Sequence, residues 1–229
     1  MADIENQLTN AVYSLTTGLP PETLASSLVS LINNAFSQSY ASLGDHDMFP
    51  KRLCGTAQLY RELGEGWLFI WTLDGRAVGT ATIRSIGRGW TRVPMWEDAH
   101  PEYIQKLDIP IDYILTERAK IILSQLKEGG CSMALYELSL VAVDPEFSRK
   151  GIGSAMMRDV EGFVRAIDQN VGGAEKTMLV IFVLEGMESE SWYRKRGYEY
   201  VATRYKDSAS WGCKLSGGFN ILTMFKNLS

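Results

Sequence analysis

The chain has 229 residues, of which 45% are hydrophobic and 22% are charged. These fractions are those of a folded globular protein and exclude a disordered chain, a collagen-like repeat and a coiled-coil rod. Lys and Arg number 23 against 27 Asp and Glu, a net charge of −4, which argues against a protein that coats a nucleic-acid backbone. No linker or internal repeat interrupts the sequence, so we expect a single domain over residues 1–229.

The cysteines and the N-terminus bear on the cellular compartment. Cys54, Cys131 and Cys213 are widely spaced and form no CxxC pair, which favours a reducing compartment without disulfides or structural zinc. Met1–Glu5 lacks the basic start and apolar run of a secretion signal. No apolar stretch approaches the roughly 18 residues that cross a bilayer. We therefore expect a cytoplasmic protein that binds no membrane, nucleic acid or metal.

The first elements in the chain are a strand and a helix. The run 11–17 is β-prone, and apolar residues recur at helical spacing over 24–36. From Ser37 to Met48 this pattern gives way to a predicted polar loop that carries aromatic residues.

A β-hairpin follows. The β-prone runs 67–73 and 77–83 are joined by Asp74-Gly75, and both turn residues tolerate the positive φ that a tight hairpin requires. Residues 87–110 are irregular, and 111–127 has the apolar spacing of a helix.

The second half alternates between the two periodicities. Its predicted elements are strands at 136–143, 178–184, 198–204 and 220–225, and helices at 152–167 and 188–196. The run 178–184 is almost continuously apolar, as is typical of a strand buried on both faces. Together with the hairpin, this order predicts an α/β (α+β) fold with a mixed central β-sheet flanked by helices.

A basic, glycine-containing turn, Ser148–Ser154, joins the first of these strands to its helix. Backbone N–H groups at a helix N-terminus bind anions, and Gly151 and Gly153 would let a phosphate approach the backbone closely. Arg149 and Lys150 add positive charge. Two interpretations stay open on these residues alone: a diphosphate site, or a glycine-assisted connection with a solvated basic pair.

Other phosphate and hydrolase motifs are absent. The dinucleotide fingerprint GxGxxG would need glycine where Met156 stands, and there is no GxxxxGK[ST]. The only histidines are His46 and His100, so the HExxH zinc motif is missing, and no GxSxG elbow occurs.

Two segments carry a family resemblance. Val141–Pro145 followed by Ser148–Ala155 resembles the acetyl-CoA signature of the Gcn5-related N-acetyltransferase (GNAT) superfamily, Arg/Gln-x-x-Gly-x-Gly/Ala after a strand. Tyr193–Tyr198 resembles the Tyr-x-x-x-Gly-Phe/Tyr segment of the same family. The resemblance is residue-specific over roughly 136–204 and architectural elsewhere. It implies a single-domain GNAT fold with acetyl-CoA as co-substrate and no metal.

The resemblance also implies roles for individual residues. The backbones of Val141 and Val143 would hold the pantetheine arm, and the N–H of Val141 would polarise the thioester carbonyl if the strand bulges there. The N–H groups from Arg149 to Ser154 would hold the diphosphate. The implied donor-binding residues are Val141, Ala142, Val143, Ser148, Arg149, Lys150, Gly151, Ile152, Gly153 and Ser154.

Tyr193 falls on the position whose hydroxyl would protonate the departing CoA thiolate; the alternative is a packing aromatic. Two positions depart from the family pattern. Ser148 stands where Arg or Gln is usual, and Gly186 stands where asparagine is frequent. Since Ser148 keeps its backbone donor, we expect donor binding to survive.

Acyl transfer to an amine requires a group that takes the amine proton. Glu137 is the candidate base, and strand alternation predicts that it shares a face with Ser139 and Val141. The alternative is a carboxylate satisfied by a neighbouring arginine or a strand N–H.

The acceptor site is expected in the loops near 36–49 and 206–218, with Tyr40 and Trp211 as candidate substrate-binding residues and 87–110 as a lid. The alternative is that these are ordinary loop residues. The expected reaction is direct acetyl transfer to a primary amine, of a small molecule in the first hypothesis. A protein N-terminus or lysine as acceptor, a non-catalytic CoA-binding module, and a homodimer stay open.

Overall fold

The computed structural model describes residues 7–41, 51–85, 113–115, 133–170, 174, 176–207 and 218–229. Within these residues, eight strands form one sheet in the order β1-β2-β3-β5-β6-β8-β7-β4. The strands are β1 (Thr9–Tyr13), β2 (Trp67–Leu73), β3 (Arg76–Ser85), β4 (Tyr113–Leu115), β5 (Met133–Val143), β6 (Lys176–Leu184), β7 (Glu199–Asp207) and β8 (Gly218–Asn227). The predicted mixed α/β architecture is confirmed.

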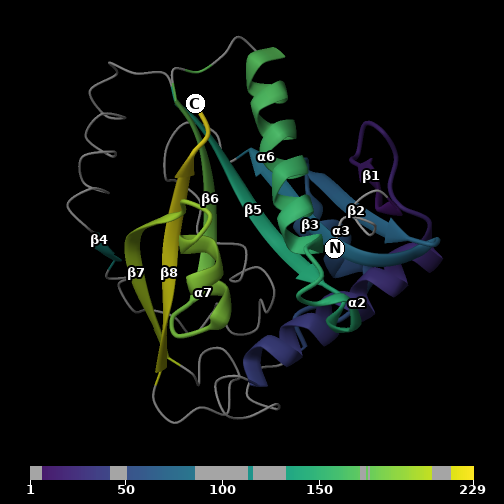
Figure 1. Ribbon diagram of the computed structural model, residues 1–229, viewed down its shortest axis with the longest axis horizontal. Coiled ribbons are helices and arrows are strands. Elements are labelled where there is room, and N and C mark those ends of the chain that lie inside the picture. Colours follow the sequence, from purple (N-terminus) through teal and green to yellow (C-terminus); the bar gives the residue numbers. More distant parts are fainter. Residues whose placement is uncertain are drawn as a thin grey trace.

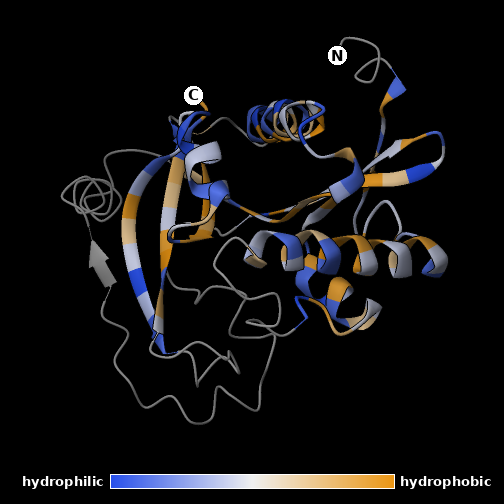
Figure 2. Cartoon of the chain, turned by 60° about the horizontal axis from the view of Figure 1, so that its bottom comes forward, coloured by the Kyte–Doolittle hydropathy of each residue, from blue (hydrophilic) through white to orange (hydrophobic). Residues whose placement is uncertain are grey.

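Helices cover both faces of this sheet. They are α2 (Glu22–Ala41), α3 (Thr56–Leu63), α6 (Ile152–Asn170) and α7 (Glu188–Arg194), with a short 3-10 helix, η2 (Pro145–Phe147). Figure 2 shows α6 on one side of the sheet and α2 with α3 on the other. None of the helices in the described ranges is long and apolar enough to cross a membrane.

Each helical layer is held by apolar residues spaced three or four apart. On α6, Val160 and Val164 are fully buried in a cluster that also holds Leu138 of β5. On the opposite face, Leu28 and Ile32 of α2 pack in a second buried cluster. Burying a side chain of this size stabilises the fold by about 1.5–3 kcal/mol, so the two layers fix the sheet between them.

The predicted hairpin is confirmed. Strands β2 and β3 pair antiparallel, with Leu73 opposite Arg76. Asp74 and Gly75 both have positive φ, 50° and 76°, which is the backbone that a two-residue turn of this hand requires.

Strands β5 and β6 are the one parallel pair among the described strands, and they separate partway along. Their ladder matches Met133–Glu137 with Lys176–Val180. Beyond it, β5 continues to pair with β3, and β6 with β8. Figure 1 shows the two strands side by side near the C-terminus and diverging toward α2 and α7. The facing edges of β5 and β6 are therefore left without a strand partner where they diverge.

A β-bulge lies in the diverging part of β5. The register runs Thr82 to Ser139 and then Thr80 to Ala142, so two residues of β5 oppose one of β3. Leu140 has φ 48°, a left-handed conformation that is rare for a branched side chain. The bulge that the resemblance required beside Val141 is therefore present.

The bulge corrects one prediction about side-chain direction. Simple alternation put Glu137, Ser139 and Val141 on one face. The extra residue reverses the alternation after Ser139, and Val141 packs against the α6-side cluster while Leu140 packs on the α2 side. Because an inserted residue shifts every later side chain to the other face, Glu137 and Val141 lie on opposite faces.

Two helices in the first part of the chain differ from prediction. The helix expected over 24–36 continues to Ala41, because Tyr40 is one turn beyond Phe36 and their rings make an edge contact with centroids 5.9 Å apart. Helix α3 was not predicted. It is only eight residues long, and its two buried leucines, Leu59 and Leu63, are too few to establish a helical periodicity in the sequence.

The helix predicted over 111–127 is wrong at its start. Tyr113–Leu115 forms strand β4, which pairs antiparallel with β7. An apolar run that contains aromatic and β-branched residues suits either state, and here an available sheet edge decides it. The rest of that predicted helix lies outside the described residues.

Candidate donor-binding and active site

The turn after β5 is shaped to receive an anion. Arg149 and Gly151 both have positive φ, 62° and 88°, and successive N–H groups converge in such a backbone. The N–H groups from Arg149 to Gly153 make no hydrogen bond to any described residue. We call this segment, residues 149–153, the cradle.

The cradle is narrower than predicted at both ends. The N–H of Ser148 donates to the Pro145 carbonyl at 3.1 Å, and the N–H of Ser154 donates to the Gly151 carbonyl at 2.9 Å. These two groups close the turn and the first helical turn of α6, so they are not available to a ligand. Five N–H groups remain.

Gly153 lets α6 approach α7 closely. A Cβ at this position would lie 3.1 Å from Cζ2 of Trp192, closer than ordinary van der Waals contact. The cradle is therefore packed directly against the helix that carries Tyr193.

The start of the turn is fixed by Asp144. Its carboxylate accepts the N–H of Glu146 at 3.0 Å and the Arg76 guanidinium at 2.6 Å. Arg76 and Lys150 both lie over the ring of Phe147, at 5.3 and 4.8 Å from its centroid. These contacts hold the Lys150 ammonium beside the cradle.

Tyr193 lies on α7 and is 5% exposed. Its ring makes edge contacts with Trp192 and Tyr198, at centroid distances of 4.8 and 5.2 Å. Its hydroxyl makes no hydrogen bond to a described residue. Burial raises the pKa of Tyr193 above its usual value, against a smaller lowering by the charge of Arg196. The phenol is therefore protonated at neutral pH, and within the described residues its hydroxyl is not engaged by another acceptor.

Glu137 stands at the last matched position of the parallel ladder, opposite Val180. It is 3% exposed. Arg84 donates to its Oε2 at 2.7 Å, while its Oε1 is buried with no hydrogen-bond partner among the described residues. One oxygen is therefore paired, as the structural alternative predicted, and the other remains able to accept a proton.

The predicted acceptor residues are placed only in part. Tyr40 is helical and not in a loop, and it is 5% exposed in a cluster with Leu184, Met187 and Ile221. This cluster joins the end of α2 to strands β6 and β8. Trp211 and the predicted lid at 87–110 lie outside the described residues, so their roles stay predictions.

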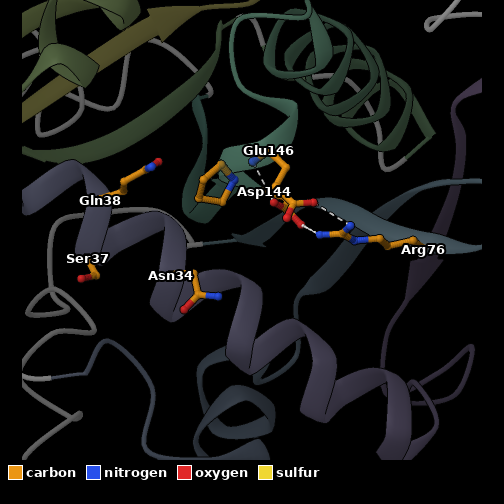
Figure 3. Close-up of a pocket in the computed structure, with 7 residues that line it drawn as sticks. Asn34, Ser37, Gln38, Arg76, Asp144 and Glu146 are labelled. Atoms are coloured by element: carbon orange, nitrogen blue, oxygen red, sulfur yellow. Dashed lines mark hydrogen bonds and ion pairs between the residues drawn. The ribbon is translucent and has the colours of Figure 1, made fainter.

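A polar recess that the sequence did not reveal lies between α2 and the turn that precedes the cradle. Its volume is about 350 Å³, and it is lined by Asn34, Ser37, Gln38, Arg76, Asp144, Pro145 and Glu146. Figure 3 shows the α2 side chains on one side and the ion pairs of Arg76 with the two carboxylates on the other. In the sequence, the only sign of this recess is the spacing of three polar residues of α2, Asn34, Ser37 and Gln38, at i, i+3 and i+4.

Arg196 is a further feature of the site to which the sequence analysis gave no role. Its Nη2 donates to Oγ of Ser154 at 2.5 Å, and its Nη1 donates to the Trp192 carbonyl at 3.1 Å. Its guanidinium carbon lies 3.5 Å from the centroid of the Trp192 ring. The side chain thus connects α7 to the first turn of α6.

Solved structures share this fold. A protein from Streptococcus mutans, smu.2055, superposes with a TM-score of 0.54 at 14% identity, covering 96% of this chain and 99% of that one. The ribosomal-protein-S18-alanine N-acetyltransferase of Escherichia coli gives 0.51 at 15%, covering 96% and 95%. The PaiA N-acetyltransferase of Thermoplasma acidophilum, solved with coenzyme A, gives 0.51 at 12%, covering 95% and 98%.

The sequence comparison agrees with the fold. Residues 113–200 match the family model of the acetyltransferase (GNAT) domain. A comparison with the curated proteins gave no match. The family match over these residues and the shared fold agree with the resemblance to the GNAT superfamily seen in the two motifs.

Proposed function

We propose that this chain is an acetyl-CoA-dependent N-acetyltransferase that moves the acetyl group directly to a primary amine of a small molecule. The observation that carries the proposal is the cradle. Five N–H groups without partners among the described residues, from Arg149 to Gly153, stand at the end of a strand whose inner edge has no strand partner there.

The residues present fit CoA. The cradle would hold the diphosphate through its N–H groups, with Arg149 and Lys150 beside it. The unpaired edge of β5 near Val141 and Val143 would hydrogen-bond the amides of the pantetheine arm as an added strand does. When bound, acetyl-CoA supplies the activated acetyl thioester. The bulge at Leu140 interrupts the regular ladder next to Val141, and its N–H would polarise the thioester carbonyl.

Two side chains would move the protons. Oε1 of Glu137 would take one proton from the amine, directly or through a water, so that the amine nitrogen can form the new C–N bond. Tyr193 would give its phenolic proton to the sulfur as the C–S bond breaks. Two observations support this role: the Tyr193 hydroxyl makes no hydrogen bond to a described residue, and its neighbour on α7, Trp192, lies against Gly153 of the cradle.

The acceptor proposal is supported by the α2 side of the sheet. Glu137 lies on the same face of β5 as Leu140, which packs against the α2 cluster. The polar recess is lined by α2 and carries two carboxylates against one guanidinium. A net negative, hydrogen-bonding recess attracts a small cationic or polar amine.

A thiol-release assay tests the proposal. The protein is incubated with acetyl-CoA and a panel of small primary amines, lysine peptides and peptides with free N-termini, and free CoA is measured. Release with one or more small amines is the expected result. Release with peptides alone would make the chain a protein N-acetyltransferase. CoA binding without release for any acceptor would indicate a non-catalytic CoA-binding module.

A further inference from the structure

We propose that Arg196 is an additional CoA-binding residue, whose guanidinium contributes positive charge to the diphosphate site from the turn that follows α7. This inference rests on the proposed donor site and adds to it a residue outside the glycine-containing turn. The side chain reaches the cradle through Ser154, the third residue of α6, whose hydroxyl accepts from Nη2 at 2.5 Å.

The position of the guanidinium is rigid. It stacks on the Trp192 ring at 3.5 Å and donates to the Trp192 carbonyl at 3.1 Å. The Trp192 ring lies against Gly153 of the cradle and leaves little room for a Cβ at that position. A charge held in this way is preorganised, so a ligand does not have to order the side chain on binding.

The positive charge of Arg196 is only partly compensated within the described residues. The N-terminus of α6 carries the positive end of the helix dipole, and a cation is unfavourable there. The first turn of α6 contains no acidic residue, and Arg196 has no ion pair with a described carboxylate. Burial lowers the pKa of Arg196, against smaller opposing contributions from Tyr193, Glu161 and Tyr198, so the charged form is held at a cost. The negative charge of a diphosphate beside Ser154 would pair with the Arg196 guanidinium and offset its unfavourable interactions with the helix dipole and with its buried surroundings.

Neighbouring cations do not share this arrangement. Arg194 is paired with Glu190 at 2.9 Å on the exposed side of α7. Lys195 is exposed, one residue from Arg196, with no contact to the cradle among the described residues. Lys195 therefore offers a matched control, because its removal takes the same charge from the same helix end.

The test is calorimetric titration of CoA into the wild type and into R196M, R196K, S154A and K195M, at several salt concentrations. We expect R196M to weaken CoA binding about tenfold, since a hydrogen bond or ion pair to a charged group is of that size. R196K should recover part of the loss, S154A should lose about two- to threefold, and K195M should change by less than about twofold. The salt dependence of CoA binding should be shallower in R196M, a change that a purely structural role would not produce.

The outcomes separate this inference from the proposed function. If R196M matched K195M in both affinity and salt dependence while the wild type bound CoA, Arg196 would not be a donor-site residue. If the wild type bound no CoA, the donor site itself and the proposed function would both fail. Thermal unfolding of each variant identifies a folding defect, and R196K and S154A keep the test decisive if R196M is unstable.

Discussion

Glu137 of β5 and Val180 of β6 are the last residues that the two parallel strands bring into register. Three features meet next to this pair. The pairing between β5 and β6 ends here, and β5 has a bulge at Leu140. A buried carboxylate oxygen of Glu137 makes no hydrogen bond to any described residue. Because the sheet opens at this one pair, unpaired backbone of β5 and the carboxylate of Glu137 lie next to each other, as the proposed acyl transfer requires.

Replacing Tyr193 by Phe tests the proton donor. We expect kcat for thiol release to fall about 100-fold, within the range that a general acid contributes, with CoA affinity unchanged. The matched control is Tyr198→Phe. Tyr198 is also buried and its ring contacts that of Tyr193, yet its hydroxyl makes no hydrogen bond within the described residues. Equal activity of the two variants would remove Tyr193 from the mechanism.

Replacing Glu137 by Gln tests the base. The amide cannot take a proton from the amine, so kcat should fall about 100-fold while CoA binding persists. Arg84→Met should instead act on stability. It leaves a buried carboxylate without its 2.7 Å partner, a change that costs about 3–5 kcal/mol in free energy of unfolding. Full activity of E137Q with the best acceptor would show that Glu137 is only a structural partner of Arg84.

Two glycines, one in the cradle and one within α6, should respond in opposite ways to alanine. Gly151 has φ 88°, so alanine there should destabilise the fold by about 1–2 kcal/mol and weaken CoA binding by distorting the cradle. Gly162 lies within α6 and is exposed, and a Cβ added there would meet nothing within 4 Å. Alanine at this position should stabilise by about 1 kcal/mol without affecting CoA. Urea unfolding and CoA titration measure both effects; unchanged CoA affinity in G151A would contradict the assignment of the cradle.

The buried tyrosines predict a decline of stability at alkaline pH. Burial raises the pKa of Tyr193 and Tyr198 in the folded state, while an unfolded tyrosine titrates near pH 10. Above about pH 10 the unfolded chain loses protons that the folded chain retains, so the free energy of unfolding falls as pH rises. At about pH 11 the loss is about 1.4 kcal/mol per tyrosine.

The Y193F/Y198F double variant isolates this contribution. Its urea midpoint should decline less than that of the wild type between about pH 9 and 11. Comparing the two proteins cancels the opposite contribution of Lys206, whose pKa burial lowers to about 8. Parallel declines would show that neither phenol is protected from ionisation.

The elements that could be predicted are those with strong local signals. Asp74 and Gly75 specify their hairpin through positive φ, and Gly197, with φ 83°, follows the end of α7 as a helix-terminating glycine does. The cradle was predicted from its two glycines and its place between a strand and a helix.

Other features depend on contacts that are distant in sequence. No glycine marks the bulge at Leu140 in the sequence, because the bulge depends on the register between β5 and β3. β4 forms because β7 offers an edge to Tyr113–Leu115. Arg196 reads as one basic residue among three, and only the packing of α7 on α6 brings it to Ser154. These are tertiary effects, and a single sequence gives no local pattern for them.

The most direct test of the account is a thermal unfolding titration of the wild type with acetyl-CoA, CoA and NADH. Ligands that bind the folded state raise the melting temperature by mass action. The account predicts a concentration-dependent rise with acetyl-CoA and CoA, no rise with NADH, and a much smaller rise with CoA in G151A. No rise in the wild type at millimolar acetyl-CoA would contradict it, because the cradle from Arg149 to Gly153 would then not be a donor site.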